Sequence, residues 1–390
     1  MSTQITRRSL LSAGLLALTG CGQPPPAPVE AAHAATPTGT SRLRLVGEST
    51  LPHRMDFAGT TVGGLSGIDY QSSTGLYALI SDDRSVRNPA RFYTAHLPLD
   101  GHGLGTAALQ GVHLLRRADG STFPSRRRAR DGDEVPDPEA IRWLPNGHLL
   151  WCSEGAARHG MGPALHESRA DGSLVRTLAL PAMFDARPGE GTGPRDNQAA
   201  EGLALSPDGR TAWLAMETAL LQDGPAPRVG AAGGPCRITA LDVATGQALH
   251  QFAYVPDAIS ARGPVPGLVP PVVYADSGIS EILMQDAHHM LVLERAYVAG
   301  QGMALRLYRV DTRSASNTLA LPQLRADNHQ PAAKTLVADF ATLGLGLLDN
   351  TEGMTWGPVL PSGRRSLVVV SDDNFRRSQT TQFAAFEFTE

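Results

Sequence analysis

A two-strand unit with polar markers recurs five times along this chain. Each unit has a short apolar strand with an acid or a serine near its start, then a turn, then a second apolar strand that ends in an acid. Glycine ends four of the five turns, where it adopts a positive φ at little cost. Such matched series indicate a repeat architecture. The first-strand markers are Ser66, Glu139, Glu201, Glu281 and Glu352, and the second-strand markers are Asp82, Glu154, Glu217, Glu294 and Asp372.

The two series of markers advance together at intervals of 62 to 80 residues. Further strand-like runs follow the pairs, such as residues 91–97, 237–242 and 304–310. Four strands per repeat predict an all-β fold, a β-propeller with long loops, in which we count five units and leave room for a sixth blade. Residues 42–50 and 383–388 also have strand character, and we expect them to complete one blade and close the ring.

The composition agrees with an all-β domain. The 41 glycines and 29 prolines would interrupt long helices, which disfavours helical bundles and coiled coils. Hydrophobic residues make up 42% of the chain, enough to fill a core, so a disordered chain is excluded. The net charge of -4 gives no reason to expect nucleic acid as a partner. We expect a monomer.

The first forty residues are predicted to direct and tether the protein. Residues 1–20 combine the basic pair Arg7-Arg8 with an apolar stretch, as in a bacterial export signal. The Arg pair resembles a twin-arginine signal, with an ordinary export signal as the alternative. Residues 18–21 resemble a lipobox, which predicts lipidation of Cys21, although a plain signal peptide with a chance cysteine remains open. We therefore expect an exported protein, lipid-anchored in the cell envelope or periplasm, with a Pro/Ala-rich tether at 21–40 and the propeller domain at 41–390.

Two further cysteines, Cys152 and Cys236, lie 84 positions apart and show no spacing signature. Export permits a disulfide between them. Two separate buried thiols are the simpler interpretation.

In a propeller, the first strand of each blade lies nearest the axis, and the second runs antiparallel to it, so their marked ends meet at one mouth of the channel. Carboxylates gathered there need protons, Arg side chains or a hard cation to offset their repulsion. Ca²⁺ fits best because it takes six to eight oxygen ligands, whereas no His or Cys recurs to suit Zn²⁺. Acids that merely form turns, and a purely structural Ca²⁺ site, are the alternatives. The predicted metal ligands are Asp82, Asp83, Glu139, Glu154, Glu217, Glu281, Glu294, Asp372 and Asp373, with Glu201 and Glu352 as catalytic candidates.

Arginines accompany the acids at Arg84, Arg295 and Arg376. A guanidinium pairs bidentately with phosphate oxygens, so these side chains are candidates for phosphate binding. Salt bridges within the acidic ring are an equally good interpretation.

The marker segments together resemble the phytase-like domain family, whose members are described as esterase-like proteins of the phytase family. The resemblance covers roughly residues 45–390. By analogy with calcium-dependent propeller phytases, it implies phosphoester hydrolysis. The phosphate-binding lysines of those enzymes are not matched, since Lys334 is the only lysine of this chain. The segments that carry the resemblance are 65–68, 81–83, 138–141, 200–203, 294–295, 351–354 and 371–374.

The sequence thus predicts an exported, lipid-anchored, Ca²⁺-dependent hydrolase that acts on a small-molecule ester or phosphoester. A non-catalytic metal-binding propeller of the envelope and a metal-dependent lactonase or carboxylesterase are the alternatives. No Gly-x-Ser-x-Gly motif occurs, which disfavours a serine esterase.

Overall fold

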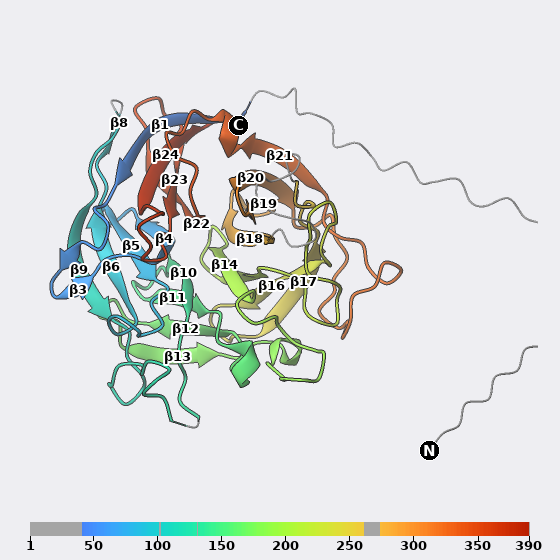
Figure 1. Cartoon of the computed structure of the whole chain (residues 1–390). Helices are drawn as coiled ribbons and strands as arrows, with labels where there is room; N and C mark the ends of the chain where they lie inside the picture. Colours follow the sequence, from blue (N-terminus) through green and yellow to red (C-terminus); the bar gives the residue numbers. More distant parts are fainter. Residues whose placement is uncertain (1–40, 101–102, 131, 261–273, 390) are drawn as a thin grey trace, which may run out of the picture. The chain divides into compact units, whose positions relative to one another are not determined.

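Five four-stranded antiparallel sheets surround a central axis, as Figure 1 shows. We call these sheets blades 1 to 5 in the order of their innermost strands along the chain. The computed structural model describes residues 41–100, 103–130, 132–260 and 274–389. The predicted signal peptide, Cys21 and the tether lie outside the described residues.

Blades 1 to 4 each take their strands in chain order from the axis outward. Blade 1 contains β4 (Leu65–Gln71), β5 (Leu76–Ser81), β6 (Arg91–His96) and β9 (Ala108–Leu114). Blade 2 contains β10 (Pro138–Trp143), β11 (Leu149–Ser153), β12 (Ala164–Ser168) and β13 (Leu174–Leu178). Blade 3 contains β14 (Ala200–Leu205), β15 (Thr211–Met216), β16 (Cys236–Asp242) and β17 (Ala248–Tyr254). Blade 4 contains β18 (Ala275–Met284), β19 (His289–Val298), β20 (Gly302–Asp311) and β21 (Lys334–Asp339).

Blade 5 joins the two ends of the domain. It contains β22 (Thr351–Val359), β23 (Arg365–Ser371) and β24 (Gln382–Phe388), and its outermost strand is β1 (Leu43–Thr50). Strand β1 pairs antiparallel with β24, so the predicted closure of the ring is confirmed. Pairing the first strand with the last leaves no open edge at the joint. The propeller is thus confirmed, with five blades in the described residues.

The remaining elements in the described residues are short. Two small hairpins pair β2 (Asp56–Phe57) with β3 (Thr60–Thr61) and β7 (Leu99–Asp100) with β8 (Gly103–Leu104). Three 3-10 segments are η1 (Ala157–His159), η2 (Ala182–Phe184) and η3 (Phe340–Thr342). In this part of the chain, no helix has the length and apolar character needed to cross a membrane.

The hydrophobic core is divided among the interfaces between blades. Each of five buried apolar clusters draws its side chains from two neighbouring blades. Between blades 1 and 2, for example, Phe92 and Ile80 pack with Trp151 and Ile141. Burial of such side chains contributes about 1.5–3 kcal/mol each relative to exposure, so the interfaces hold the ring together. Cys152 and Cys236 are both buried, with free thiols.

The inner strands approach one another closely around the axis. They contact in the cyclic order β4, β10, β14, β18 and β22. Glycine occupies the tightest points, because a Cβ on Gly67 would lie 2.6 Å from the Glu139 carbonyl oxygen, and one on Gly353 would lie 2.8 Å from that of Ser66. No larger side chain fits there without moving the neighbouring strand.

A buried ion pair lies among the inner strands. The guanidinium of Arg142, on β10, is 2.7 Å from a carboxylate oxygen of Glu281, on β18. The other carboxylate oxygen of Glu281 accepts a hydrogen bond from the Leu203 amide of blade 3. Together the two side chains contact the inner strands of all five blades. The guanidinium also donates to the main-chain carbonyls of Ile68, Ile141, Ile282 and Met354.

Candidate functional site

Each inner strand carries a β-bulge, which lies near the start of the strand in blades 1, 2, 3 and 5 and in the middle of β18 in blade 4. A bulge inserts one extra residue and redirects its side chain, and bulges are frequent beside active sites. The register between first and second strands shifts at the same point of every blade, around Ser66, Glu139, Glu201, Ser280 and Glu352. The sequence markers of blades 1, 2, 3 and 5 therefore lie at equivalent positions.

The second-strand markers of the same four blades reach this end of the ring. In each of them, the marker amide donates a hydrogen bond to the carbonyl oxygen two residues before the bulge, at 2.6–2.9 Å. The two strand ends are thus fastened together, and their acids share one mouth, as expected from the antiparallel pairing. The donor and acceptor pairs are Asp82 to Gly64, Glu154 to Asp137, Glu217 to Ala199 and Asp372 to Asn350.

Blade 4 departs from the pattern by one residue. Its bulge lies at Ser280 rather than Glu281, and Gly278 pairs with Arg295, so Arg295 takes the place of the second marker. Because side chains alternate between faces along a strand, a shift of one residue turns a side chain to the opposite face. Glu281 accordingly binds Arg142, and Glu294 faces a different set of partners.

Glu294 lies in a separate polar cluster. Its carboxylate accepts hydrogen bonds from the Tyr254 hydroxyl at 2.6 Å and the Asp257 amide at 3.0 Å, and it forms an ion pair with Lys334 at 2.5 Å. The structure therefore places Glu281 and Glu294, two of the expected metal ligands, away from the other marker acids.

The paired aspartates at 82–83 and 372–373 divide their tasks. The first of each pair faces the mouth, where burial and the neighbouring carboxylates raise the pKa of both Asp82 and Asp372 well above 3.8. The second anchors the loop that follows. Asp83 binds the guanidinium of Arg91 at 2.8 Å and accepts the amides of residues 86–88. Asp373 accepts the amides of Gly64 and Phe375, both at 3.0 Å.

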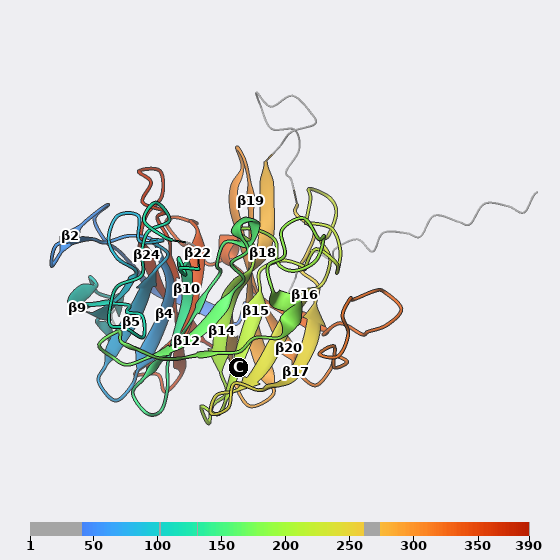
Figure 2. The same cartoon turned by 90° about the horizontal axis from the view of Figure 1, so that it is seen from below.

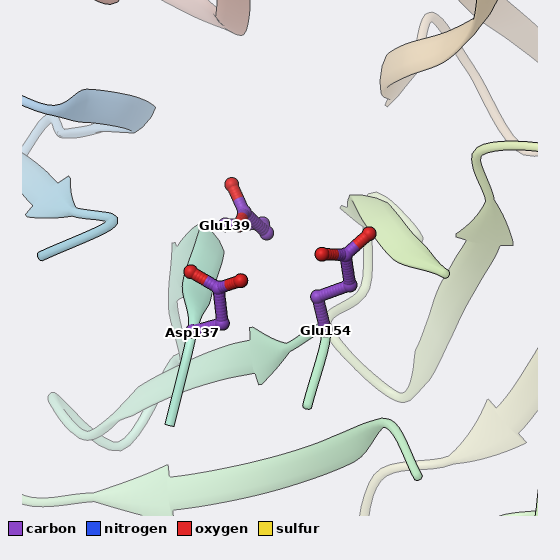
Figure 3. A group of neighbouring side chains, drawn as sticks. All are labelled: Asp137, Glu139 and Glu154. Carbon is purple, nitrogen blue, oxygen red and sulfur yellow. The ribbon is translucent and has the colours of Figure 1, made fainter. Parts of the chain in front are cut away.

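The carboxylates of blades 2 and 3 come close enough to share a cation. Asp137, Glu139 and Glu154 each place an oxygen within 4.8 Å of the others, and so do Glu154, Glu201 and Glu217. Glu154 belongs to both groups. Figure 3 shows the first group, with Asp137 just before β10, Glu139 within it and Glu154 just after β11.

Sequence reasoning missed Asp137. It lies two residues before the Glu139 marker and outside the strand, so it is not part of the repeated strand pattern. The sequence contains one signal for Asp137. Asn350 lies two residues before Glu352, as Asp137 lies two residues before Glu139, and Asn350 lines the cavity. Asp137 is fully buried, and its Oδ2 lies 2.5 Å from the Arg84 guanidinium, whereas its Oδ1 has no hydrogen-bond partner within the described residues. Buried carboxylates in this condition call for a cation or a proton.

Two arginines partly neutralise the acids. Arg84 forms an ion pair with Asp137 at 2.5 Å. Arg295 lies 3.1 Å from Glu217 and 3.3 Å from Glu352, and it donates a hydrogen bond to the Asn350 side chain at 2.7 Å. Arg376 is exposed at the rim. Two of the three predicted phosphate-binding arginines are therefore engaged in the acidic ring.

The cluster favours protonated carboxyls when no cation is bound. Burial, followed by the charge of Asp276, raises the pKa of Glu217 to about 8. Burial raises the pKa of Asp137 to about 6, although the nearby Arg84 opposes the change. Burial and the neighbouring carboxylates also hold the pKa values of Glu139, Glu154 and Glu201 well above 4.5. Strongly perturbed acids in one cavity are typical of functional sites.

An open cavity of about 920 Å³ lies over the acids. Its size matches that of small-molecule sites, which occupy about 300–1,000 Å³. Asn197, Asn374 and Phe375 on its wall have positive φ angles of 58°, 45° and 52°, and such strained residues cluster at functional sites. Besides the three arginines, seven of the predicted acids line the cavity: Asp82, Asp83, Glu139, Glu154, Glu201, Glu217 and Glu352.

Comparison with solved structures finds distant likenesses. A calcium-binding protein, regucalcin, from Agrobacterium tumefaciens is 13% identical, with 89% of this chain and 96% of that chain covered and a TM-score of 0.39. A periplasmic gluconolactonase from Pseudomonas aeruginosa is 13% identical, with 85% and 87% covered and a TM-score of 0.32. The catalytic domain of an α-L-arabinofuranosidase from Coprinopsis cinerea is 8% identical, with 89% and 98% covered and a TM-score of 0.42. These scores are too low to carry an argument.

Comparison with curated proteins finds no match. Comparison with family models finds one match. The phytase-like model, described as esterase-like activity of phytase, matches residues 60–375, which include all five bulges and the acids around the mouth. The resemblance seen in the marker segments is thus confirmed, and this propeller belongs to the phytase-like family.

Proposed function

We propose that the protein is a Ca²⁺-dependent hydrolase of small-molecule phosphoesters. The observation that carries the proposal is the buried cluster of carboxylates beneath an open cavity, with arginines on the same wall. Structural acids would be expected to pair with cations or amides, as Asp83 and Asp373 do. The acids at the mouth instead outnumber the arginines bound to them.

The donor set suits a hard cation. Both groups of close carboxylates contain oxygen ligands alone, which Ca²⁺ prefers and which Zn²⁺ sites seldom rely on. The carboxylate of Asp137 is directed into this cluster, with one oxygen beside the Arg84 guanidinium and the other buried without a hydrogen-bond partner in the described part of the chain. Asp137, Glu139, Glu154, Glu201 and Glu217 would hold the cation, and Glu154 would be shared if there are two.

The chain supplies the remaining chemistry. A bound Ca²⁺ would offset the charge of the substrate phosphate and lower the pKa of an attacking water. Glu352 is positioned by Arg295 and by Asn350, whose side-chain amide donates to it at 2.9 Å. Glu201 is held by neither of these residues, and burial with the neighbouring carboxylates raises its pKa, as is common for groups that act in acid–base catalysis.

Arginines on the cavity wall would bind the phosphate. Arg376 is exposed and has no ion pair within the described residues, so its guanidinium is available to phosphate oxygens. Arg84 is 38% exposed and would bridge Asp137 and the substrate. Arg295 is 17% exposed and would act mainly by holding Glu217 and Glu352.

We also propose that the enzyme works in the cell envelope, anchored by a lipid on Cys21. The support is the N-terminal sequence, where the basic pair, the apolar stretch and the lipobox-like residues 18–21 occur in the order of a lipoprotein signal. A Pro-rich tether would then hold the propeller away from the membrane.

The test is an assay of the purified protein against a phosphomonoester, a phosphodiester, a lactone and an acyl ester, with Ca²⁺ and with a chelator. We expect phosphoester turnover with Ca²⁺ and its loss with the chelator. Glu201→Gln and Glu352→Gln should each lower kcat by about 100-fold or more, in the range of acid–base and electrostatic contributions. The matched control is Glu190→Gln, because Glu190 is an exposed loop residue outside the cavity. Turnover of the lactone or acyl ester alone, or full activity in both site variants, would refute the proposal.

A further inference from the structure

The cavity over the acids has two chemically different walls. Blade 1 contributes Arg84 and Arg87 from the loop between β5 and β6. Blade 4 contributes Tyr297 and Met303, and the segment from blade 4 to blade 5 contributes Leu348. Blades 1 and 4 are not neighbours, because β4 contacts β10 and β22, whereas β18 contacts β14 and β22. The two walls are therefore separated by blade 5, with the apolar side chains of Val86 and Phe375 lying beside the arginines of the basic wall.

The apolar wall is built on strands longer than those around it. Strands β18, β19 and β20 have ten residues each, whereas β4, β5 and β6 have six or seven. The extra length projects beyond the other blades, as Figure 2 shows for β18 and β19. Tyr297 pairs directly with Met303 across β19 and β20, so both side chains lie on one face of the projecting sheet. The ring of Tyr274 packs against that of Tyr297, with centroids 6.1 Å apart.

The basic wall is held by contacts of its own. The guanidinium of Arg87 lies over the Phe375 ring, 4.4 Å from its centroid. Arg84 is fixed by Asp137, and Asp83 anchors the loop that carries both arginines. An anion entering the cavity would therefore meet positive charge on this side. On the other side it would meet Asp276, which is paired with Tyr297 across β18 and β19, and Arg295, whose charge is already shared by Glu217 and Glu352.

We infer that the substrate is a monoanionic or dianionic phosphoester whose alcohol portion is apolar, an aryl or alkyl phosphate. This inference rests on the proposed phosphoester hydrolysis. The phosphate lies over the acidic floor on the side of Arg84 and Arg87, and the apolar group packs against Tyr297, Met303 and Leu348. A sugar carrying many phosphates is disfavoured, because its further phosphates would be brought against apolar side chains and Asp276.

The test is calorimetric binding of two phosphonates to the Ca²⁺-loaded full-length protein. Benzylphosphonate and methylphosphonate share the anionic group, resist hydrolysis and differ in apolar area. We expect benzylphosphonate to bind roughly tenfold more tightly, because the ring removes apolar surface from water. Met303→Ser and Tyr297→Ser should each reduce this preference to about threefold or less, with methylphosphonate affinity unchanged. Leu249→Ser is the matched control, since Leu249 is 49% exposed on β17 and lies outside the cavity.

Each outcome decides the inference. Equal affinity of the two phosphonates for the wild-type protein, or a benzyl preference that survives both variants, would overturn it. If a phosphoester is still hydrolysed in that case, the proposed function stands and only the substrate class is wrong. If neither phosphonate binds and no phosphoester is hydrolysed, both proposals fail. Melting temperatures of the variants equal to that of the wild type verify that lost preference does not reflect unfolding.

Discussion

Arg295 lies 3.1 Å from Glu217, at the position where every other blade places an acid. One of the five second-strand positions of the ring therefore holds a cation, which also pairs with Glu352 and so links blades 3, 4 and 5. Arg295 is the residue after Glu294, and its place in the ring follows from the bulge at Ser280. Because of this one-residue change of register, the fourth repeat contributes a positive charge to the ring instead of a negative one.

Loss of this cation should destabilise the metal-free protein. Arg295→Met leaves Glu217 and Glu352 without their shared partner, and breaking a buried ion pair costs about 3–5 kcal/mol. We expect urea unfolding at pH 8 without Ca²⁺ to show a loss of this order, and Arg295→Lys to recover part of it. Saturating Ca²⁺ should narrow the difference. Equal stability of wild type and Arg295→Met under metal-free conditions would show that the arginine does not neutralise the ring.

Glu281 and Glu139 should respond to substitution in opposite ways. Glu281→Gln removes the buried partner of Arg142 and should lower the free energy of unfolding by about 3 kcal/mol, with Ca²⁺ affinity unchanged. Glu139→Gln removes a carboxylate from the mouth and should weaken Ca²⁺ binding with little loss of metal-free stability. Denaturant unfolding and Ca²⁺ titration of the two variants provide the comparison. Weakened Ca²⁺ binding in Glu281→Gln would show that Glu281 is a ligand of the metal, contrary to its pairing with Arg142.

The metal-free protein should lose stability as pH rises from 5 to 8. The folded-state pKa values of Glu217 (about 8) and Asp137 (about 6) lie above their ordinary values of 4.5 and 3.8. Raised carboxyl pKa values mean that the folded state binds more protons in this window. Their stabilising contribution is therefore complete below pH about 4 and is lost as pH passes through the folded-state values.

Thermal unfolding with a chelator measures this effect. We expect the melting temperature to fall by about 5 °C or more between pH 5 and pH 8, and Ca²⁺ to restore most of it at pH 8. Glu217→Gln should make the melting temperature less dependent on pH, because it removes a carboxyl whose pKa is raised to about 8. A melting temperature that rises over this range without metal would contradict the assignment.

Much of the fold was readable from the sequence, because the marker acids, the turns and the terminal strand segments repeat with the blades. The pairing of β1 with β24 followed from the need to close the ring. The one-residue shift in blade 4 could not be predicted from the sequence. Ser280 and Glu281 are both candidates for the bulge position, and Glu294 and Arg295 are both candidates for the position at the mouth. Only the position of the bulge, set by packing against the neighbouring strands, decides which one faces the mouth.

The roles within the site were harder to predict than its position. Asp82 and Asp83 are identical in type and adjacent, but only Asp83 binds Arg91 and the amides of the following loop, and the course of the chain after β5 decides which of the two does so. Asp137 precedes its strand and so falls outside a search for strand markers. Arg142 gives no sequence signal for its role, because its partners are main-chain carbonyls of distant blades.

Lipidation should govern where the protein is found. Cys21→Ala removes the only thiol in the lipobox-like segment, and we expect the protein to move from the membrane fraction to the soluble fraction of the envelope. Cys152→Ala, which alters a buried thiol of the propeller, is the control and should stay with the membrane if it folds. Soluble wild-type protein, or membrane association unaffected by Cys21→Ala, would exclude the anchor.

The most direct test of the account is a calorimetric titration of Ca²⁺ into metal-free protein at pH 7, with wild type and Glu154→Gln side by side. Glu154 is shared by the two close carboxylate groups, so its loss weakens every Ca²⁺ site that they form. The account predicts saturable binding to the wild type and an affinity lower by roughly tenfold or more in Glu154→Gln, since Ca²⁺ affinity follows the number of charged ligands. Absence of binding to the wild type, or equal binding by both proteins, would contradict it.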